Sequence, residues 1–237
     1  MDIEQIIKRI AEEVYGQIRA EEANNGGSAG VQSASAPAAE TVYSYMRITA
    51  TVKDIADACN TVKNSGASVL CVPEWFVDTA AQALKGSNKR VATFVGLPGG
   101  ATSSFAKYAE AKQAVVSGAE MVFIPVNMQL LNAGDWNGAR NDLAETMVPC
   151  KGKAAVMAVL EVDSLSLDQL TTAAGMCAAC GVDCVMLSAV NGGRPNDSHV
   201  KAVKGQGVRV GIYGGVTDGN RAAYQSAGAT MFAVSRV

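Results

Sequence analysis

Short apolar segments alternate with amphipathic segments from about residue 41 to the end of the 237-residue chain. The amphipathic segments have helical periodicity, and several end in glycine, as helices commonly do. Continuous apolar strands that alternate with helices indicate a parallel sheet covered by helices. Eight such units favour a closed (β/α)8 TIM barrel over an open doubly wound sheet. The predicted strands are residues 41–46, 68–73, 91–96, 121–126, 154–162, 184–189, 208–213 and 230–235.

The predicted barrel lacks its final outer helix. Only Arg236 and Val237 follow the last predicted strand, so an eighth outer helix has no sequence to form it. We therefore expect a groove between the first and seventh outer helices that is apolar and uncovered.

The first forty residues differ in composition from the rest of the chain. Residues 1–20 carry isoleucine and valine at steps of three and four, which predicts an amphipathic helix. Residues 21–40 are rich in Ala, Gly, Ser and Asn, which predicts a flexible linker to the barrel of residues 41–237. The apolar face of the predicted helix consists of Ile3, Ile6, Ile7, Ile10, Val14 and Ile18.

Composition and charge exclude several classes of function. Hydrophobic residues make up 49% of the chain and charged residues 18%, as in ordinary soluble proteins, and the net charge is −2. A chain without a long basic run is not expected to bind nucleic acid. No apolar run reaches the roughly 18 residues that a membrane span needs. We expect a cytoplasmic protein.

The six cysteines do not indicate disulfides or a metal site. The chain shows no signal peptide, so a reducing compartment is expected. Cys177 and Cys180 lie in an alanine-rich helical stretch without a second pair of ligands, so they are predicted to be buried small residues. No metal and no cofactor are predicted.

The carboxyl ends of the strands are where barrel enzymes place their catalytic groups. Carboxylates and hydroxyls occur there, but neither a lysine nor a histidine does. The lysines precede strands or lie in outer helical segments, and His199 lies in an outer helix. An acid and base at these positions would have to come from Glu161, Asp163 and Tyr213.

Six segments at the predicted strand ends form a recognisable series. They are RVATFVGLPGG (90–100), SGAEMVFIPVNMQLLNAGD (117–135), AVLEVDSLSLDQL (158–170), GVDCVMLSAVNGG (181–193), VGIYGGV (210–216) and GATMFAVS (228–235). In this order and spacing they resemble segments of the deoxyribose-phosphate aldolase family. The resemblance implies a class I aldolase, which holds its substrate as a Schiff base on a lysine.

Four residues depart from the pattern of that family. Met186 stands where the resemblance places the Schiff-base lysine, and Gly211 where it places a second lysine that lowers the pKa of the first. Phe123 and Val42 stand at the positions of two aspartates. A Schiff base needs a partly deprotonated primary amine. The resemblance therefore implies that class I activity is lost, and apolar Phe123 and Met186 are expected to fill the barrel mouth.

The phosphate site implied by the resemblance is partly kept. Ser188, Gly214, Gly215 and Ser235 retain the corresponding positions, and backbone amides of a glycine turn can hold an anion. A glycine pair needed only for a tight turn explains the sequence equally well. The loop Gly96–Gly100 is likewise either a tight turn or a binding loop.

The predicted helix of residues 1–20 has three interpretations. Its design resembles the encapsulation peptides that direct cargo into bacterial microcompartments, which implies shell or cargo proteins as partners. Alternatively, it could cover the groove of its own barrel, which a linker of this length could reach. Binding to a membrane surface is not expected because the helix lacks a basic face.

Two functions follow from these observations. The first is a catalytically inactive binding or scaffold protein associated with a microcompartment, which binds a phosphorylated small molecule and associates with further copies of itself. The second is an active aldolase or lyase on a phosphorylated aldehyde or sugar that uses non-standard residues.

Overall fold

The computed structural model of the chain describes residues 39–189 and 193–237. The predicted helix of residues 1–20 and nearly all of the predicted linker lie outside these described residues. So do residues 190–192, at the start of the loop after the sixth strand.

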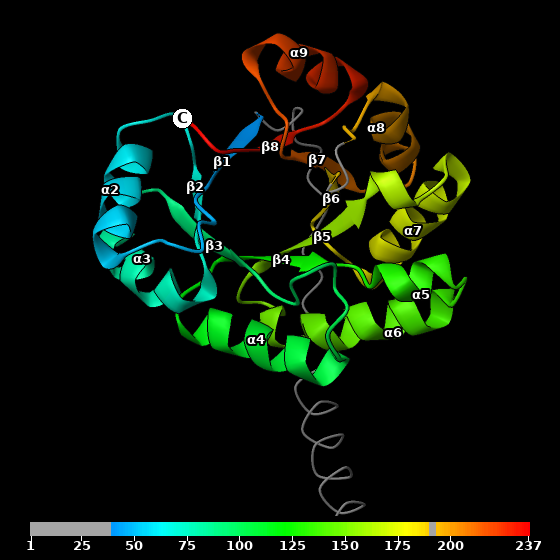
Figure 1. The fold of residues 1–237 in the computed structure, drawn as a ribbon, viewed down its shortest axis with the longest axis horizontal. Helices are drawn as coiled ribbons and strands as arrows, with labels where there is room; N and C mark the ends of the chain where they lie inside the picture. Colours follow the sequence, from blue (N-terminus) through cyan, green and yellow to red (C-terminus); the bar gives the residue numbers. More distant parts are fainter. Residues whose placement is uncertain (1–38, 190–192) are drawn as a thin grey trace, which may run out of the picture. The chain divides into compact units, whose positions relative to one another are not determined.

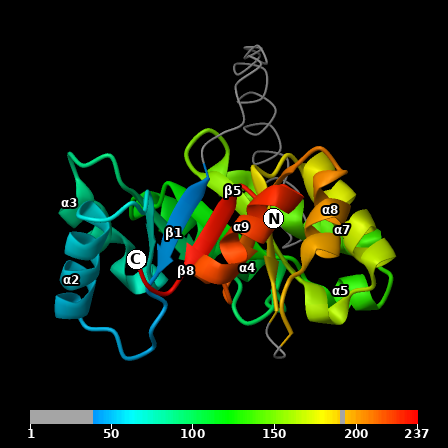
Figure 2. The ribbon, with the colours of Figure 1, turned by 90° about the horizontal axis from the view of Figure 1, so that it is seen from above.

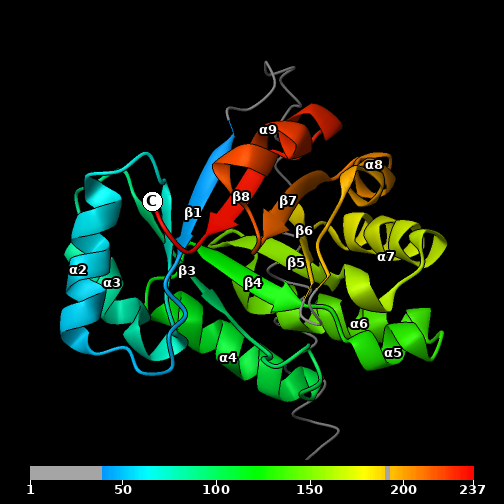
Figure 3. The same ribbon diagram turned by 45° about the horizontal axis from the view of Figure 1, so that its top comes forward.

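Eight parallel strands form a closed barrel in which each strand pairs with its neighbours in sequence and β8 pairs with β1. Figures 1 and 3 show the strands as a ring with helices outside it. This confirms the predicted (β/α)8 fold, and all eight strands are shorter than predicted. The strands are β1 (Glu40–Ser44), β2 (Val69–Cys71), β3 (Arg90–Phe94), β4 (Met121–Pro125), β5 (Ala155–Glu161), β6 (Cys184–Ser188), β7 (Arg209–Tyr213) and β8 (Met231–Val234).

The helices of the described residues occupy the segments between strands. The α-helices are α2 (Val52–Lys63), α3 (Val77–Leu84), α4 (Ser104–Val116), α5 (Met128–Asn132), α6 (Trp136–Met147), α7 (Leu167–Cys180), α8 (Asp197–Lys204) and α9 (Asp218–Ala227). Short 3-10 helices are η1 (Glu74–Phe76), η2 (Val148–Cys150) and η3 (Val162–Ser164).

Local sequence explains where the outer helices begin and end. The side chain of Ser166 accepts a bond from the Gln169 amide at the start of α7, and the Gln169 side chain returns a bond to Ser166. Gly181 ends α7 with a φ of 82°, a conformation that favours glycine. α2 instead ends at Lys63 and is capped by Asn64, so the glycine expected there is not its cap.

Alternation along the strands creates two cores. In β6, Val185 and Leu187 pack against the helices, whereas Cys184 and Met186 face the barrel interior. The interior core, which we call the lumen, is filled by apolar and sulfur-containing side chains. It comprises Val42, Val69, Cys71, Ala92, Phe94, Met121, Phe123, Met157, Val159, Cys184, Met186, Met231 and Ala233.

A charged cluster closes the amino-terminal end of the barrel. Glu40 forms ion pairs with Arg90 and with Arg209, the latter at 3.5 Å. Its carboxylate also accepts a hydrogen bond from the Ser68 hydroxyl at 3.2 Å. Glu40 therefore belongs to β1, whereas the sequence analysis assigned it to the linker.

A groove of about 750 Å³ lies outside the barrel beside β1 and β8. Figures 1, 2 and 3 show the last residues running from β8 toward α2 on this side. The groove was expected to be apolar, but its lining is mixed, because Thr41, Arg221 and Arg236 line it together with Val216, Val234 and Val237. The Arg221 guanidinium lies 4.7 Å from the ring centre of Phe232 and donates to the Thr41 hydroxyl at 2.7 Å. Arg221 thus covers part of the sheet that an apolar helix would cover.

A buried ion pair joins α4 to α6. Lys107 is fully buried and pairs with Asp142, and it also donates to the carbonyl of Gly100 at 3.1 Å. Ser104 donates to the second carboxylate oxygen of Asp142 at 2.9 Å. Lys107 thereby ties the loop after β3 to the outer helices.

Among the described residues, no helix combines the length and apolar character needed to cross a membrane.

Candidate functional site

The candidate site is the carboxyl end of the barrel, where the residues predicted at the strand ends are brought together. Met186 and Gly211 are direct partners in the register of β6 and β7. A Cβ atom added to Gly211 would lie 2.8 Å from Cε of Met186, closer still to its Sδ, and 3.1 Å from Cβ of Met231. The Met186 side chain is completely buried. It therefore occupies the space into which a side chain at position 211 would project.

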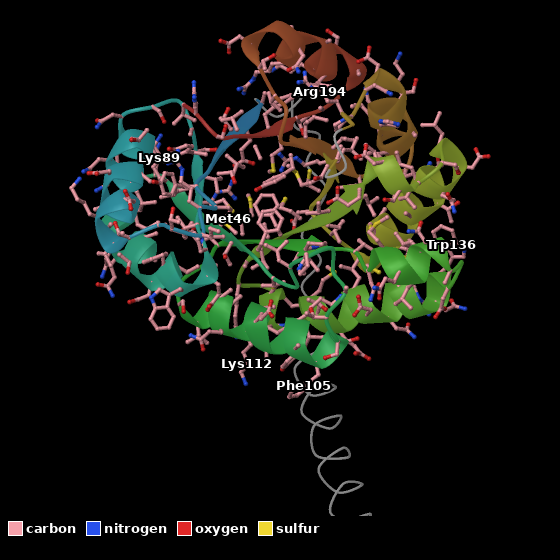
Figure 4. All side chains as sticks on the ribbon, in the orientation of Figure 1. Met46, Lys89, Phe105, Lys112, Trp136 and Arg194 are labelled. Carbon is pink, nitrogen blue, oxygen red and sulfur yellow. The ribbon has the colours of Figure 1, made fainter. Side chains whose placement is uncertain are left out.

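Three aromatic rings fill the lumen at this carboxyl end of the barrel. Phe94 stacks on Phe123 with ring centres 4.9 Å apart, and Tyr213 meets Phe94 edge to face at 5.0 Å. Met46 points toward the centre of the strand ring in Figure 4 and packs on the lumen core. This confirms that Phe123 and Met186 contribute apolar volume at the mouth.

Tyr213 adds a hydroxyl group to this cluster of rings. Its hydroxyl is hydrogen-bonded to the hydroxyl of Ser44, with 2.9 Å between the oxygens. Burial raises the pKa of Tyr213 to about 12, because the phenolate would lose its hydration. At neutral pH the Tyr213 hydroxyl is therefore protonated.

The two predicted carboxylates lie at the end of β5. Glu161 is nearly buried and is the register partner of Ser188 on β6. Asp163 lies in η3, and a Cβ added to Gly193 would overlap its carboxylate unless that side chain moved. The negative charge of Glu161 also contributes to the raised pKa of Tyr213. Glu161, Ser188 and Tyr213 therefore share one end of the barrel.

No lysine of the described residues faces the lumen core. Lys107 is buried outside the barrel between α4 and α6, and Lys89 donates to the carbonyls of Ser65 and Ala67 after α2. The remaining described lysines are exposed, and they lie on segments outside the barrel. The placement predicted from the sequence is thus confirmed, although the burial of Lys107 was not foreseen.

The four predicted phosphate positions are not equivalent. Ser188 is buried at the end of β6, whereas Ser235 is exposed and lines the outer groove. Gly214 and Gly215 both have positive φ, of 80° and 67°, as a tight turn requires. The Gly214 amide already donates to the carbonyl of Ala233 at 3.3 Å. These contacts favour the turn interpretation for Gly214.

Other candidate residues have structural contacts. The loop 96–100 turns through a bond from the Gly100 amide to the Gly96 carbonyl, and the Gly96 amide donates to Glu110. His199 lies in α8 as predicted and accepts a bond from the Asn196 amide at 3.2 Å. None of the six cysteines, all of which lie in described segments, forms a disulfide.

Sequence reasoning missed Ser44, Met46 and Phe94. Ser44 follows Val42 on the same face of β1, and Phe94 follows Ala92 in β3, so the two-residue period could have identified both. Their contacts with Tyr213 could not be found this way, because they join strands that are distant in sequence. Within the described segments, no group of three or more His, Cys, Asp or Glu residues could hold a metal ion.

The fold and the position of these groups define a (β/α)8 barrel of the kind that carries chemistry at the carboxyl ends of its strands. The deoxyribose-phosphate aldolase of Geobacillus sp. (strain WCH70) is 30% identical over 198 residues, which cover 81% of this chain and 89% of the relative. That of Histophilus somni (strain 2336) is 30% identical over 172 residues, 71% of this chain and 76% of the relative. The chain therefore belongs to the deoxyribose-phosphate aldolase family.

Solved structures are similar across the whole barrel. A candidate deoxyribose-phosphate aldolase from Coccidioides immitis matches with a TM-score of 0.79 at 23% identity, covering 94% of this chain and 93% of its own. The deoxyribose phosphate aldolase of Aeropyrum pernix matches with a TM-score of 0.74 at 18% identity, covering 83% and 85%. These similarities support the fold. No family model matches the chain.

Proposed function

We propose that this chain is a member of the aldolase family that forms no Schiff base and acts as a binding or scaffold protein. The observation that carries the proposal is the packing of Met186 over Gly211. A lysine nucleophile in the lumen would need a partly deprotonated amine and space for the substrate carbonyl beside it. Met186 supplies no amine, and its thioether fills the space above the β7 backbone.

The aromatic rings support the same proposal. Phe94, Phe123 and Tyr213 pack within 4.9 to 6.1 Å of one another, so the lumen is filled where a sugar would have to enter. Burying sugar hydroxyls against such rings without hydrogen-bond partners is unfavourable. A phosphorylated ligand would instead be held at the rim, by the Ser188 hydroxyl and the turn at Gly214 and Gly215.

The proposed binding to partner proteins rests on residues 1–20. We propose that Ile3, Ile6, Ile7, Ile10, Val14 and Ile18 form one face of an amphipathic helix that docks on shell or cargo proteins of a bacterial microcompartment. Fusing residues 1–40 to a fluorescent reporter and expressing the fusion with shell proteins should give puncta. Replacing Ile7 and Ile10 with Asp should make the signal diffuse. A diffuse signal from the unmodified fusion would contradict docking.

Borohydride trapping tests the loss of Schiff-base chemistry. The full chain is incubated with acetaldehyde and borohydride, and the product is analysed by intact-protein and peptide mass spectrometry. We expect no stoichiometric adduct, whereas the Geobacillus relative treated in parallel serves as the positive control. A stoichiometric adduct on a single lysine of this chain would refute the proposal.

A second candidate function is favoured by the hydroxyl pair of Tyr213 and Ser44. With a pKa raised to about 12, Tyr213 would serve as a general acid, and Glu161 or Asp163 would serve as the base of a lyase that needs no lysine. Aldol cleavage of a panel of phosphorylated sugars, measured for the full chain and for Tyr213→Phe, tests this candidate. Activity that disappears in Tyr213→Phe would support it, and absence of activity would leave the binding function.

A further inference from the structure

Sulfur-containing side chains are concentrated in the lumen. Figure 4 shows sulfur atoms within the ring of strands. Methionine often fills cores as a flexible apolar side chain, so its abundance alone does not indicate a site. The arrangement of the sulfur atoms is therefore what matters. The buried lumen residues that carry sulfur are Cys71, Met121, Met157, Cys184, Met186 and Met231.

Three of these side chains lie in one layer of the lumen. Met121 of β4 is the register partner of Ala155 of β5, and Cys184 of β6 is the partner of the residue two positions later in β5. The same two-residue step leads through β7 from Cys184 to Met231 of β8. Inward-facing side chains on alternate strands share one layer of a (β/α)8 barrel when the strands are staggered in this way. Met121, Cys184 and Met231 therefore converge at one height in the lumen.

Met186 brings a further sulfur atom close to this layer. Its Sδ lies 3.8 Å from Sγ of Cys184, and the thiol donates a hydrogen bond to it. A Cβ added to Gly211 would overlap the same Sδ and lie 3.1 Å from Cβ of Met231, so the thioether also lies near Met231. Two sulfur ligands that each bind one metal ion at about 2.3 Å, as thiolates bind zinc, lie roughly 4 Å apart. Cys184 and Met186 thus have the spacing of two ligands of one ion.

The chemistry of these ligands selects a soft, singly charged ion. A thiolate with thioethers offers neither oxygen nor imidazole, and sulfur ligands of this kind favour Cu(I). The side chains are buried, so a net charge held among them would be costly. Cu(I) with one thiolate is neutral, whereas a divalent ion would leave a buried positive charge.

The Cys184 thiol carries its proton until an ion replaces it. Burial raises the pKa of Cys184 to about 12; the nearby Arg209 opposes this shift and Asp183 adds to it. Binding therefore breaks the S–H bond, forms a sulfur–metal bond and releases one proton to solvent. The ion takes the position that the proton holds between the sulfur atoms of Cys184 and Met186.

We propose that the lumen contains a Cu(I) site formed by the Cys184 thiolate and the thioethers of Met121, Met186 and Met231. The site goes beyond the binding function proposed above and depends neither on Schiff-base chemistry nor on residues 1–20. Borohydride trapping and the reporter fusion can therefore fail or succeed independently of it.

Competition for copper with the Cu(I) chelator bathocuproine disulfonate tests the site. The full chain is loaded with Cu(I) without oxygen, once as the folded protein and once during refolding from urea. We expect stoichiometric copper by elemental mass spectrometry, with a sulfur-only coordination shell by X-ray absorption. Cys184→Ala should lose the ion. Met186→Leu and Met231→Leu, which each remove a thioether at nearly constant volume, should weaken binding by roughly tenfold or more.

Two variants outside the lumen are matched controls. Cys177→Ala removes a cysteine of α7 that is as completely buried as Cys184. Met147→Leu removes a buried thioether at the end of α6. Both variants should bind Cu(I) as the wild type does.

Three outcomes would overturn the proposal. One is a wild-type chain that retains no copper after either loading. Another is a Cys184→Ala variant that loses no more copper than Cys177→Ala. The third is wild-type affinity in both Met186→Leu and Met231→Leu while circular dichroism shows them folded, and this comparison replaces the second if Cys184→Ala does not fold.

Discussion

At the scale of single residues, Met186 on β6 and Gly211 on β7 are packed so closely that the residue tolerated at one position depends on the residue at the other. Gly211 does not have a positive φ, so its backbone would accept other residues. What excludes them is the thioether of Met186, together with Cβ of Met231. The glycine is therefore required by packing and not by backbone conformation.

This dependence predicts a large coupling free energy between substitutions at the two positions. Gly211→Ala should lower the free energy of unfolding by about 1–3 kcal/mol, because the added methyl overlaps Met186. In a Met186→Ala background the same substitution should cost much less, giving a coupling of about 1 kcal/mol or more. Urea denaturation of the two single variants and the double variant measures it. Additive costs would show that Met186 moves aside without penalty.

Tyr213 should contribute to the loss of stability at alkaline pH. The pKa of the side chain is 10.0 when unfolded and about 12 in the folded chain. Above pH 10 the unfolded chain loses a proton that the folded chain keeps, so the stability due to this residue is complete below pH 10 and disappears toward pH 12.

A difference of two pKa units corresponds to about 2.7 kcal/mol at most. Denaturation of Tyr213→Phe between pH 9 and pH 11.5 should therefore show a shallower decline than the wild type. Tyr224→Phe serves as the comparison, because its pKa is also raised by burial but its hydroxyl lies outside the lumen, bonded to the carbonyl of Pro195. Equal slopes for wild type and Tyr213→Phe would contradict the prediction.

At the scale of elements, the contact between α4 and α6 depends on a buried lysine that was predicted only to lie in an outer helical segment. Lys107 occurs in a helical segment with other polar residues, and nothing in that segment distinguishes it from the exposed Lys112. Its burial follows from Asp142, which comes from a different helix. Contacts of this kind cannot be derived from the periodicity of one element.

Removing one member of this pair should be costly. Lys107→Met leaves Asp142 buried without its partner and should lower the stability by about 3–5 kcal/mol, and adding Asp142→Leu should restore part of the loss. Lys53→Met at the exposed pair with Asp57 should change the stability by at most about 1 kcal/mol. Thermal denaturation measures all three variants. A Lys107→Met variant as stable as Lys53→Met would contradict the role of the buried pair.

At the scale of the whole molecule, the eight strands and their parallel order were predictable because each strand has its own apolar run and each of the first seven is followed by a helical segment. The strand ends were less predictable, since β8 ends at Val234 and leaves Ser235 outside the sheet. The mixed lining of the outer groove was not predicted. It includes Arg221 of α9, whose guanidinium lies over the Phe232 ring and donates to Thr41, a contact between distant parts of the sequence.

Arg221 should therefore stabilise the junction of β8 with β1. Arg221→Ala removes the contact with the Phe232 ring and the bond to Thr41, and it should lower the stability by about 1–2 kcal/mol. Arg140→Ala, at an exposed arginine bonded only weakly to the neighbouring Asn141, is the control and should have little effect. The two variants are compared by urea denaturation, and equal effects would show that Arg221 does not cover the sheet.

The packing of Met186 against Gly211 also restricts the order in which amines could be introduced into this barrel. A side chain placed at position 211 first would overlap the thioether of Met186. A lysine placed at position 186 first does not meet this overlap, since it removes the thioether. Of the two orders in which two lysines could enter the lumen, only the one that begins at position 186 avoids the overlap.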